Sequence, residues 1–322
     1  MPKLQRLRYA PRWVSHLGCL IGCLDYLGME VSDAWLYGAT GHAFVLNIHP
    51  EVCPSGPTAW RSTMLFELGR NIGYAIGGVV GQKSQRDSQQ LKERAWQHVR
   101  QSIDDGLPCY AWELDLPEYY LIYGYDEVGY LFSGPRDNGP KGPKLWQELG
   151  ETGIGMIEVY SVRKGQAADD AHTVRAALSA VLKLAGGPSE WIFPEYRSGL
   201  AGYALWIDAL QRGQAMAIGM AYNAAVWAEC RRYAAEFLQE AGQRLPQHAA
   251  LFERAREHYA QVAQHLAEVS ERYPFSFDLD LRPVPVNDNS RAAVETLQAA
   301  RQAEAAGLDA AAEIVDELGR GA

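Results

Sequence analysis

Apolar residues recur at helical spacing near the start of the chain. They are Val14, Leu17, Leu20, Ile21, Leu24 and Leu27. This spacing predicts a helix over residues 12–28, with Gly28 as the residue that ends it. Ser32 and Asp33 then predict the cap of a short second helix. The following segment, 38–48, alternates and is rich in small residues, which predicts a turn and a strand.

Short β-branched and aromatic runs in the middle of the chain predict a sheet. Residues 91–103 have the pattern of an amphipathic helix that ends at an Asp-Asp-Gly turn. Three strands are predicted after it, at 108–114, 119–125 and 130–132, and a fourth at 157–162. The second and third of these strands are separated by a turn-like sequence, so they are expected to form a hairpin.

The pattern changes after about residue 168. Strand signals vanish, and helical spacing dominates to the end of the chain, at 171–185, 199–211, 215–239, 248–273 and 291–318. The sequence therefore predicts an α+β protein of two parts. Residues 1–167 form an α/β domain with an antiparallel sheet, and residues 168–322 form a helical domain.

Composition narrows the class of protein further. Hydrophobic residues make up 48% of the 322-residue chain, enough for packed cores. The net charge of −9 and the lack of a basic stripe argue against nucleic-acid and membrane partners. The basic N-terminus lacks the apolar stretch of a signal peptide. Five cysteines, an odd number, do not suggest a disulfide framework. We therefore expect a cytoplasmic protein without cofactor or metal, and leave a homo-oligomer open.

Certain motifs follow one another in an informative order. A helix ending in Tyr-Leu-Gly at residue 28 comes first. A later helix leads into a strand that begins with Gly-Leu-Pro-Cys-Tyr at 106–110. The next strand runs from Glu118 into a Gly-Tyr-Asp turn at 124–126, and residues 128–135 close the hairpin.

This order resembles the papain-like cysteine peptidase and acyltransferase superfamily. It is similar to the leader peptidase domain of bacteriocin exporters, and more so to the N-terminal domain family of butirosin biosynthesis protein H, which also carries a helical second half. The resemblance implies a papain-like fold and a nucleophilic Cys at the helix head. It also implies a catalytic His where the strand before the Gly-Tyr-Asp turn begins, and an Asp-Pro that orients this His.

The chain departs from that catalytic pattern at each position. Glu118 stands where the His is expected, and Gly134-Pro135 stands where the Asp-Pro is expected. Counting back from Gly28 puts Ser15 at the nucleophile position, whereas a helix shorter by one turn puts Cys19 there. The sequence does not decide between these two registers.

Each candidate residue has a chemical and a structural interpretation. A thiol at a helix head is activated by the helix dipole, which suits Cys19, but free Cys is often buried in a core. Ser15 is most simply an N-cap. Glu118 is a general base only if burial raises its pKa. His42, in a small-residue segment, is the candidate for the missing imidazole. His16, Cys19 and Cys23 share one helical face, but family zinc spacings are absent.

Several further residues are expected to line the ligand site. They are Ser15, His16, Asn47, Trp112 and Tyr119. We interpret the chain as a ligand-binding relative of papain-like hydrolases that has lost its Cys–His pair. Its expected ligand is a small carbonyl- or carboxylate-containing molecule or a peptide-like one. The alternative is an active cysteine hydrolase or acyltransferase that uses Cys19 on a thioester, amide or peptide-like substrate. In either case Ser15 or Cys19, Glu118 and His42 should converge on one site.

Overall fold

The computed structural model describes residues 2–136, 139–187 and 189–320, and its chain forms two compact units. The first unit contains the residues up to Val31 together with Gly73–Gln166, and the second contains Ser32–Ile72 and the chain from Ala167 onward. The protein has an α+β fold, as the sequence predicts. The segment 32–72, expected in the first domain, belongs to the second unit.

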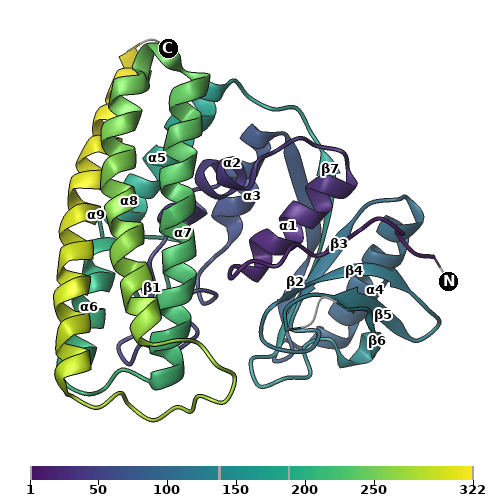
Figure 1. The fold of residues 1–322 in the computed structure, drawn as a ribbon. Coiled ribbons are helices and arrows are strands. Elements are labelled where there is room, and N and C mark those ends of the chain that lie inside the picture. The colour runs from purple at the N-terminus through teal and green to yellow at the C-terminus, as the bar shows by residue number, and fades with distance from the viewer. Residues whose placement is uncertain (1, 137–138, 188, 321–322) are drawn as a thin grey trace. The chain divides into compact units, whose positions relative to one another are not determined.

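The first unit is built on a six-stranded antiparallel sheet of order β2-β7-β3-β4-β5-β6 (Figure 1). Its strands are β2 (Tyr74–Gln82), β3 (Cys109–Trp112), β4 (Tyr119–Tyr125), β5 (Gly129–Ser133), β6 (Lys141–Leu145) and β7 (Met156–Lys164). The four predicted strands correspond to β3, β4, β5 and β7. Two strands were not predicted, the glycine-rich β2 and the proline-containing β6.

Two helices pack on the opposite faces of this sheet. Helix α1 (Ser15–Tyr26) lies on the face that carries Tyr110, whose hydroxyl meets the imidazole of His16 at 3.0 Å. Helix α4 (Ser88–Asp104) packs on β2 and β7 and contributes Leu91, against which Gly81 lies closely. Gly28 follows α1 with a φ of 64°, so it is the helix-ending residue that the sequence predicts.

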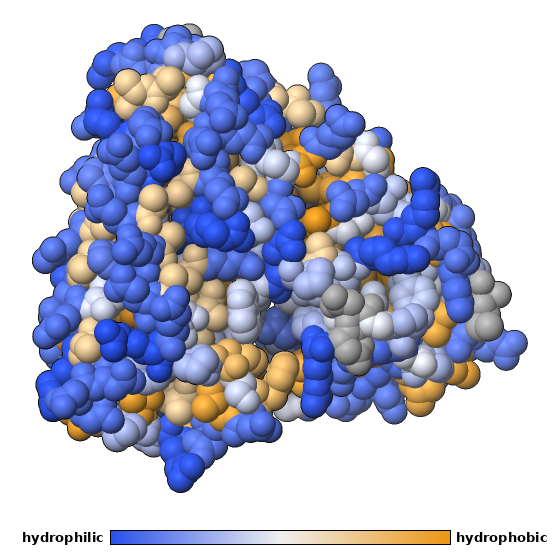
Figure 2. Space-filling view, viewed as in Figure 1, coloured by the Kyte–Doolittle hydropathy of each residue, from blue (hydrophilic) through white to orange (hydrophobic). Residues whose placement is uncertain are grey.

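The second unit is mainly helical. Helices α7 (Ala217–Arg244), α8 (Ala249–Arg272) and α9 (Asp288–Arg320) run side by side (Figure 1). The shorter helices are α2 (Asp33–Ala39), α3 (Thr63–Ile72), α5 (Asp170–Ala185) and α6 (Gly199–Gln211), and a two-residue ribbon joins β1 (Asn47–Ile48) to β8 (Arg197–Ser198). The outward faces of the long helices are largely hydrophilic (Figure 2), as expected for amphipathic helices with one buried face.

Apolar packing explains why the segment 32–72 belongs to the second unit. Helix α2 packs on α7, and the ring of Trp35 lies 5.3 Å from that of Phe237. Ser32 caps α2 by accepting a hydrogen bond from the Trp35 N–H, as predicted. These partners are about 200 positions apart in the sequence, so no local pattern could reveal the contact.

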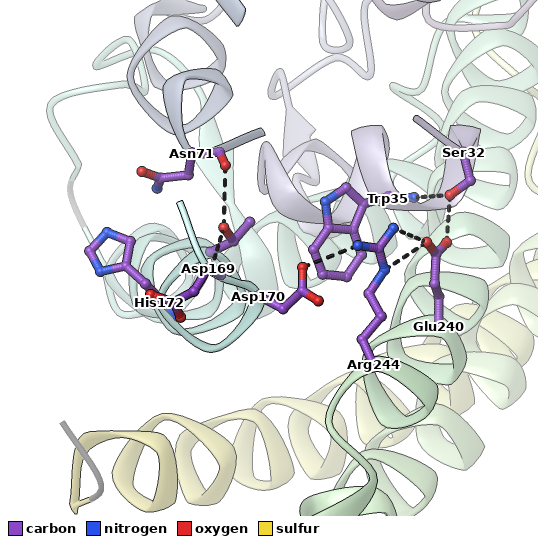
Figure 3. Close-up of polar contacts among 9 residues, drawn as sticks. Ser32, Trp35, Asn71, Asp169, Asp170, His172, Glu240 and Arg244 are labelled. Atoms are coloured by element: carbon purple, nitrogen blue, oxygen red, sulfur yellow. Dashed lines mark hydrogen bonds and ion pairs between the residues drawn. The ribbon is translucent and has the colours of Figure 1, made fainter. Parts of the chain in front are cut away.

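A polar cluster fastens α2 and α5 to the end of α7 (Figure 3). The Arg244 guanidinium lies 3.8 Å above the Trp35 ring and forms ion pairs with Glu240 and with Asp170. Ser32 donates a hydrogen bond to the same Glu240. The charged side chains of this cluster are partly exposed, so each ion pair contributes little alone, and the cluster mainly fixes the geometry of the helices.

One ion pair in this unit is fully buried. Arg231 of α7 donates from Nε to Glu304 of α9 at 2.7 Å, and its Nη1 donates to the carbonyl oxygens of Ala43 and Val45. Tyr203 donates to the same carboxylate at 3.1 Å. The C-terminal helix is thereby anchored in the core of the bundle. None of the described helices combines the length and the apolar character of a membrane-spanning segment.

Candidate functional site

Two residues at expected catalytic positions, Ser15 and Glu118, are in direct contact. Ser15 donates its hydroxyl hydrogen to the Glu118 carboxylate, and its Oγ accepts the Tyr119 backbone N–H at 3.0 Å. Helix α1 begins at Ser15 and is preceded by Val14 as its N-cap, so Ser15 is not the cap that we expected. Its hydroxyl instead joins the helix head to the start of β4.

Cys19 lies one turn further into the helix. It is the fifth residue of α1, fully buried, and burial raises the pKa of its thiol well above the usual value. Repulsion from Cys23 and Glu118 acts in the same direction. The shorter helix that would put Cys19 at the head is therefore not the one observed. A buried, protonated thiol also lacks the thiolate that nucleophilic chemistry needs.

Aromatic side chains pack against one another beside Ser15 on the α1 face of the sheet. The His16 ring packs on Tyr119 with centroids 4.1 Å apart, and Trp112 packs edge-on against Tyr119 at 5.0 Å. Trp112 and Tyr119 are directly opposite each other on β3 and β4, so both side chains leave the same face. Three of the predicted ligand residues thus lie together beside Ser15.

A second carboxylate, which was not predicted from the sequence, completes this group. Glu158 of β7 accepts a hydrogen bond from the Tyr119 hydroxyl at 2.9 Å, and burial raises its pKa. No basic side chain of the described chain forms an ion pair with it. The sequence offers little indication of this role, because Glu158 is a single polar residue in β7, and β7 pairs with strands that are distant in the sequence. The site therefore holds the half-buried carboxylates of Glu118 and Glu158, linked through Ser15 and Tyr119.

This arrangement lacks the parts of a catalytic dyad. A Cys–His pair works because the thiol and the imidazole have ordinary pKa values of about 8.5 and 6.5, so the proton moves at little cost. A serine hydroxyl is a much weaker acid than a thiol, and a carboxylate is a much weaker base than imidazole. Glu118 can hold Ser15 in place but cannot deprotonate it efficiently at neutral pH. Within the described residues no cluster of His, Cys, Asp or Glu suits a metal ion.

His42 and Asn47 belong to the second unit. His42 lies in a 3-10 turn (His42–Phe44) rather than in the predicted strand, and its Nδ1 is 3.7 Å from the Cys230 Sγ. Burial lowers the pKa of its imidazole to about 3, and the Trp60 ring packs on it at 5.3 Å. Asn47 is buried and donates to the carbonyl oxygens of Gly56 and Ala59. Both residues are therefore buried in the second unit, where they pack with or bond to other residues of that unit.

Comparisons with known proteins give no family for the chain. No protein-family model matches the sequence. No curated protein matches it either.

Proposed function

We propose that the first unit is a ligand-binding relative of papain-like hydrolases and acyltransferases. In this proposal Ser15 and Glu118 occupy the places of the catalytic Cys and His. The supporting observation is their contact, because the two positions have independent reference points: Ser15 is placed by its distance from Gly28, and Glu118 by the strand that leads into the Gly-Tyr-Asp turn at 124–126. Residues that occupy nucleophile and base positions should meet, and these two do.

The proposed activity is binding without turnover. The ligand is a small carbonyl-containing or peptide-like molecule that contacts the α1 head and the aromatic face beside it. Helix heads favour oxygen acceptors, but the Glu118 carboxylate already supplies a negative charge there. A neutral carbonyl group therefore suits the site better than a free carboxylate does. Trp112 offers a buried indole N–H that has no acceptor within the described chain.

A matched pair of probes tests this proposal. N-acetylphenylalanine amide and N-acetylphenylalanine carry the same side chain and differ in the charge of the terminal group. We expect the amide to raise the melting temperature of the wild-type protein and the acid to raise it less. Glu118→Ala should abolish the effect, whereas Arg94→Ala, an exposed change on α4, should retain it. The proposal fails if neither probe stabilises the wild-type protein, or if both variants respond alike.

The alternative of an active cysteine enzyme has less support. It requires Cys19 as the nucleophile, yet the thiol is buried within α1 and its pKa is raised. It also requires a base, and the residue at the corresponding position is the carboxylate of Glu118.

A further inference from the structure

Strand β2 forms one edge of the six-stranded sheet, and its backbone register can be assigned. The Gly165 N–H donates to Gly73 O at 2.7 Å, and the Lys83 N–H donates to Gly155 O at 2.8 Å. These bonds flank the continuous β2–β7 ladder. Hydrogen-bonded and non-bonded pairs alternate in an antiparallel ladder. The odd-numbered residues of β2 therefore bond to β7, and the even-numbered residues turn their N–H and C=O groups outward.

The alternate residues Ile76, Gly78 and Val80 turn their backbone N–H and C=O groups outward. Within the described chain these groups have no hydrogen-bond partner. The next one, Gln82, confirms the direction, because its N–H donates to the side chain of Gln85 rather than to β7. Gly78 is exposed and Val80 is 53% exposed. The edge thus presents donors and acceptors at the spacing of an extended main chain.

This edge also lacks the features that normally prevent strand addition. Charged residues, prolines or bulges in an edge strand normally prevent it from pairing with another strand. Strand β2 (Tyr74–Gln82) contains neither a charged residue nor a proline, and its nine pairs with β7 are continuous, without a register shift. The other edge strand, β6, carries two lysines and a proline and pairs irregularly with β5. Only one edge of the sheet is therefore suited to accept another strand.

We propose that β2 binds an extended peptide, which adds to the sheet as a further antiparallel strand. This inference goes beyond the proposed function, because it concerns the backbone edge of β2 and not the Ser15–Glu118 contact. Its main-chain groups would pair with those of Ile76, Gly78 and Val80, the mode of recognition known as β-augmentation.

Glycines on β2 favour a foreign peptide over a second copy of the chain. A symmetric pairing of two β2 strands centred on Gly78 would place Gly78 opposite its own copy and Gly77 opposite Val79. These positions would then lack the cross-strand side-chain pairs that stabilise a sheet. A peptide can bring its own bulky side chains to these positions. At Gly77 there is room for them, because even a Cβ built there meets nothing within 4 Å.

The test uses the capped peptide acetyl-Lys-Val-Thr-Val-Thr-Lys-amide as probe, with binding measured by calorimetry. Val80→Pro removes an outward N–H and leaves the β7 ladder intact, since proline is tolerated at such edge positions. We expect it to weaken binding at least about tenfold, whereas Val80→Ala should change affinity less than about threefold. Circular dichroism checks that both variants keep the wild-type fold.

Peptide variants provide a test on the wild-type protein that does not depend on a variant's folding. N-methylation of the alternate residues that face β2 should abolish binding, and N-methylation of the other alternate set should not. Equal effects of the two sets would overturn the proposal. So would a wild-type dimer that Val80→Pro makes monomeric without any peptide binding, because a second copy would then cover the edge.

One further result separates this inference from the proposed function. If the probe binds, and Glu118→Ala abolishes its binding while Val80→Pro has no effect, the ligand lies at the Ser15–Glu118 contact. The proposed function would then stand, and the strand-addition proposal would be wrong. If the N-acetylphenylalanine amide fails to bind while the peptide binds through β2, the strand-addition proposal stands and the proposed function is wrong.

Discussion

Ser15 donates its hydroxyl hydrogen to the carboxylate of Glu118, although 103 positions separate them in the chain. The same Oγ accepts the Tyr119 N–H, so one side chain joins the first residue of α1 to the start of β4. A hydroxyl that donates to a carboxylate forms a charge-assisted hydrogen bond, which is stronger than a bond between neutral groups.

The Ser15–Glu118 bond should appear as an energetic coupling. A hydrogen bond to a charged group typically contributes about 1.5–3 kcal/mol to stability. We expect Ser15→Ala and Glu118→Ala each to destabilise the first unit by about 1–3 kcal/mol in urea unfolding. The double variant should lose clearly less stability than the two single losses added together, because both changes remove the same hydrogen bond. Additive effects would show that the two side chains do not interact in solution.

The five thiols should differ sharply in reactivity. Cys19, Cys23, Cys109 and Cys230 are fully buried, and burial raises the pKa of each, whereas Cys53 is partly exposed. Ellman's reagent should titrate about one thiol per native chain and all five after denaturation. Cys53→Ser should remove the native reaction, and Cys19→Ser should leave it unchanged. Fast native labelling of Cys19 would revive the cysteine-enzyme alternative.

His42 should make stability depend on pH. Its imidazole is neutral in the folded state, with a pKa of about 3, and binds a proton near pH 6.5 once unfolded. Below pH 6.5 the unfolded state therefore binds one proton more than the folded state. The free energy of unfolding has its full value above pH 6.5 and decreases as the pH falls toward 3. The loss amounts to as much as about 1.4 kcal/mol per pH unit. His42→Gln should flatten this part of the profile relative to the wild type, and an unchanged slope would contradict the assignment.

The buried ion pair between Arg231 and Glu304 gives a further prediction. Removing one member of such a pair leaves an uncompensated charge and typically costs about 3–5 kcal/mol. Arg231→Met and Glu304→Leu should each destabilise the second unit by about that amount. The double variant should recover much of the loss, as measured by the urea midpoint. The exposed pair of Arg254 and Glu313 is the control, because breaking it should cost less than about 1 kcal/mol.

The sequence predicts elements with a clear local pattern. Helix α1, its end at Gly28, the Ser32 cap and the β4–β5 hairpin all follow from spacing and turn chemistry. Strand β2 was missed because its glycines give no alternation of apolar and polar side chains. Its nine pairs with β7 come from backbone hydrogen bonds, which no residue pattern reveals.

The candidate site was partly predictable, because some of its residues lie next to recognisable turns and strands. Ser15 and Glu118 could be located by counting from turns, and Trp112 and Tyr119 by their place on the predicted strands. Glu158 could not, because its partner Tyr119 lies on a strand that is not adjacent to its own. His42 was misplaced because small residues at 38–41 continue a helix and a turn here, whereas we interpreted them as leading into a strand.

The central claim, binding without turnover at the Ser15–Glu118 contact, can be tested in a single sample. Isotope-labelled protein is titrated with N-acetylphenylalanine methyl ester, and nuclear magnetic resonance follows both the protein amides and the ester. We predict saturable shifts of the Ser15 and Tyr119 amides and the Trp112 indole, with the ester hydrolysed no faster than in the presence of the Ser15→Ala variant. Hydrolysis that Ser15→Ala or Cys19→Ser stops, or the absence of any shift at these residues, would contradict the account.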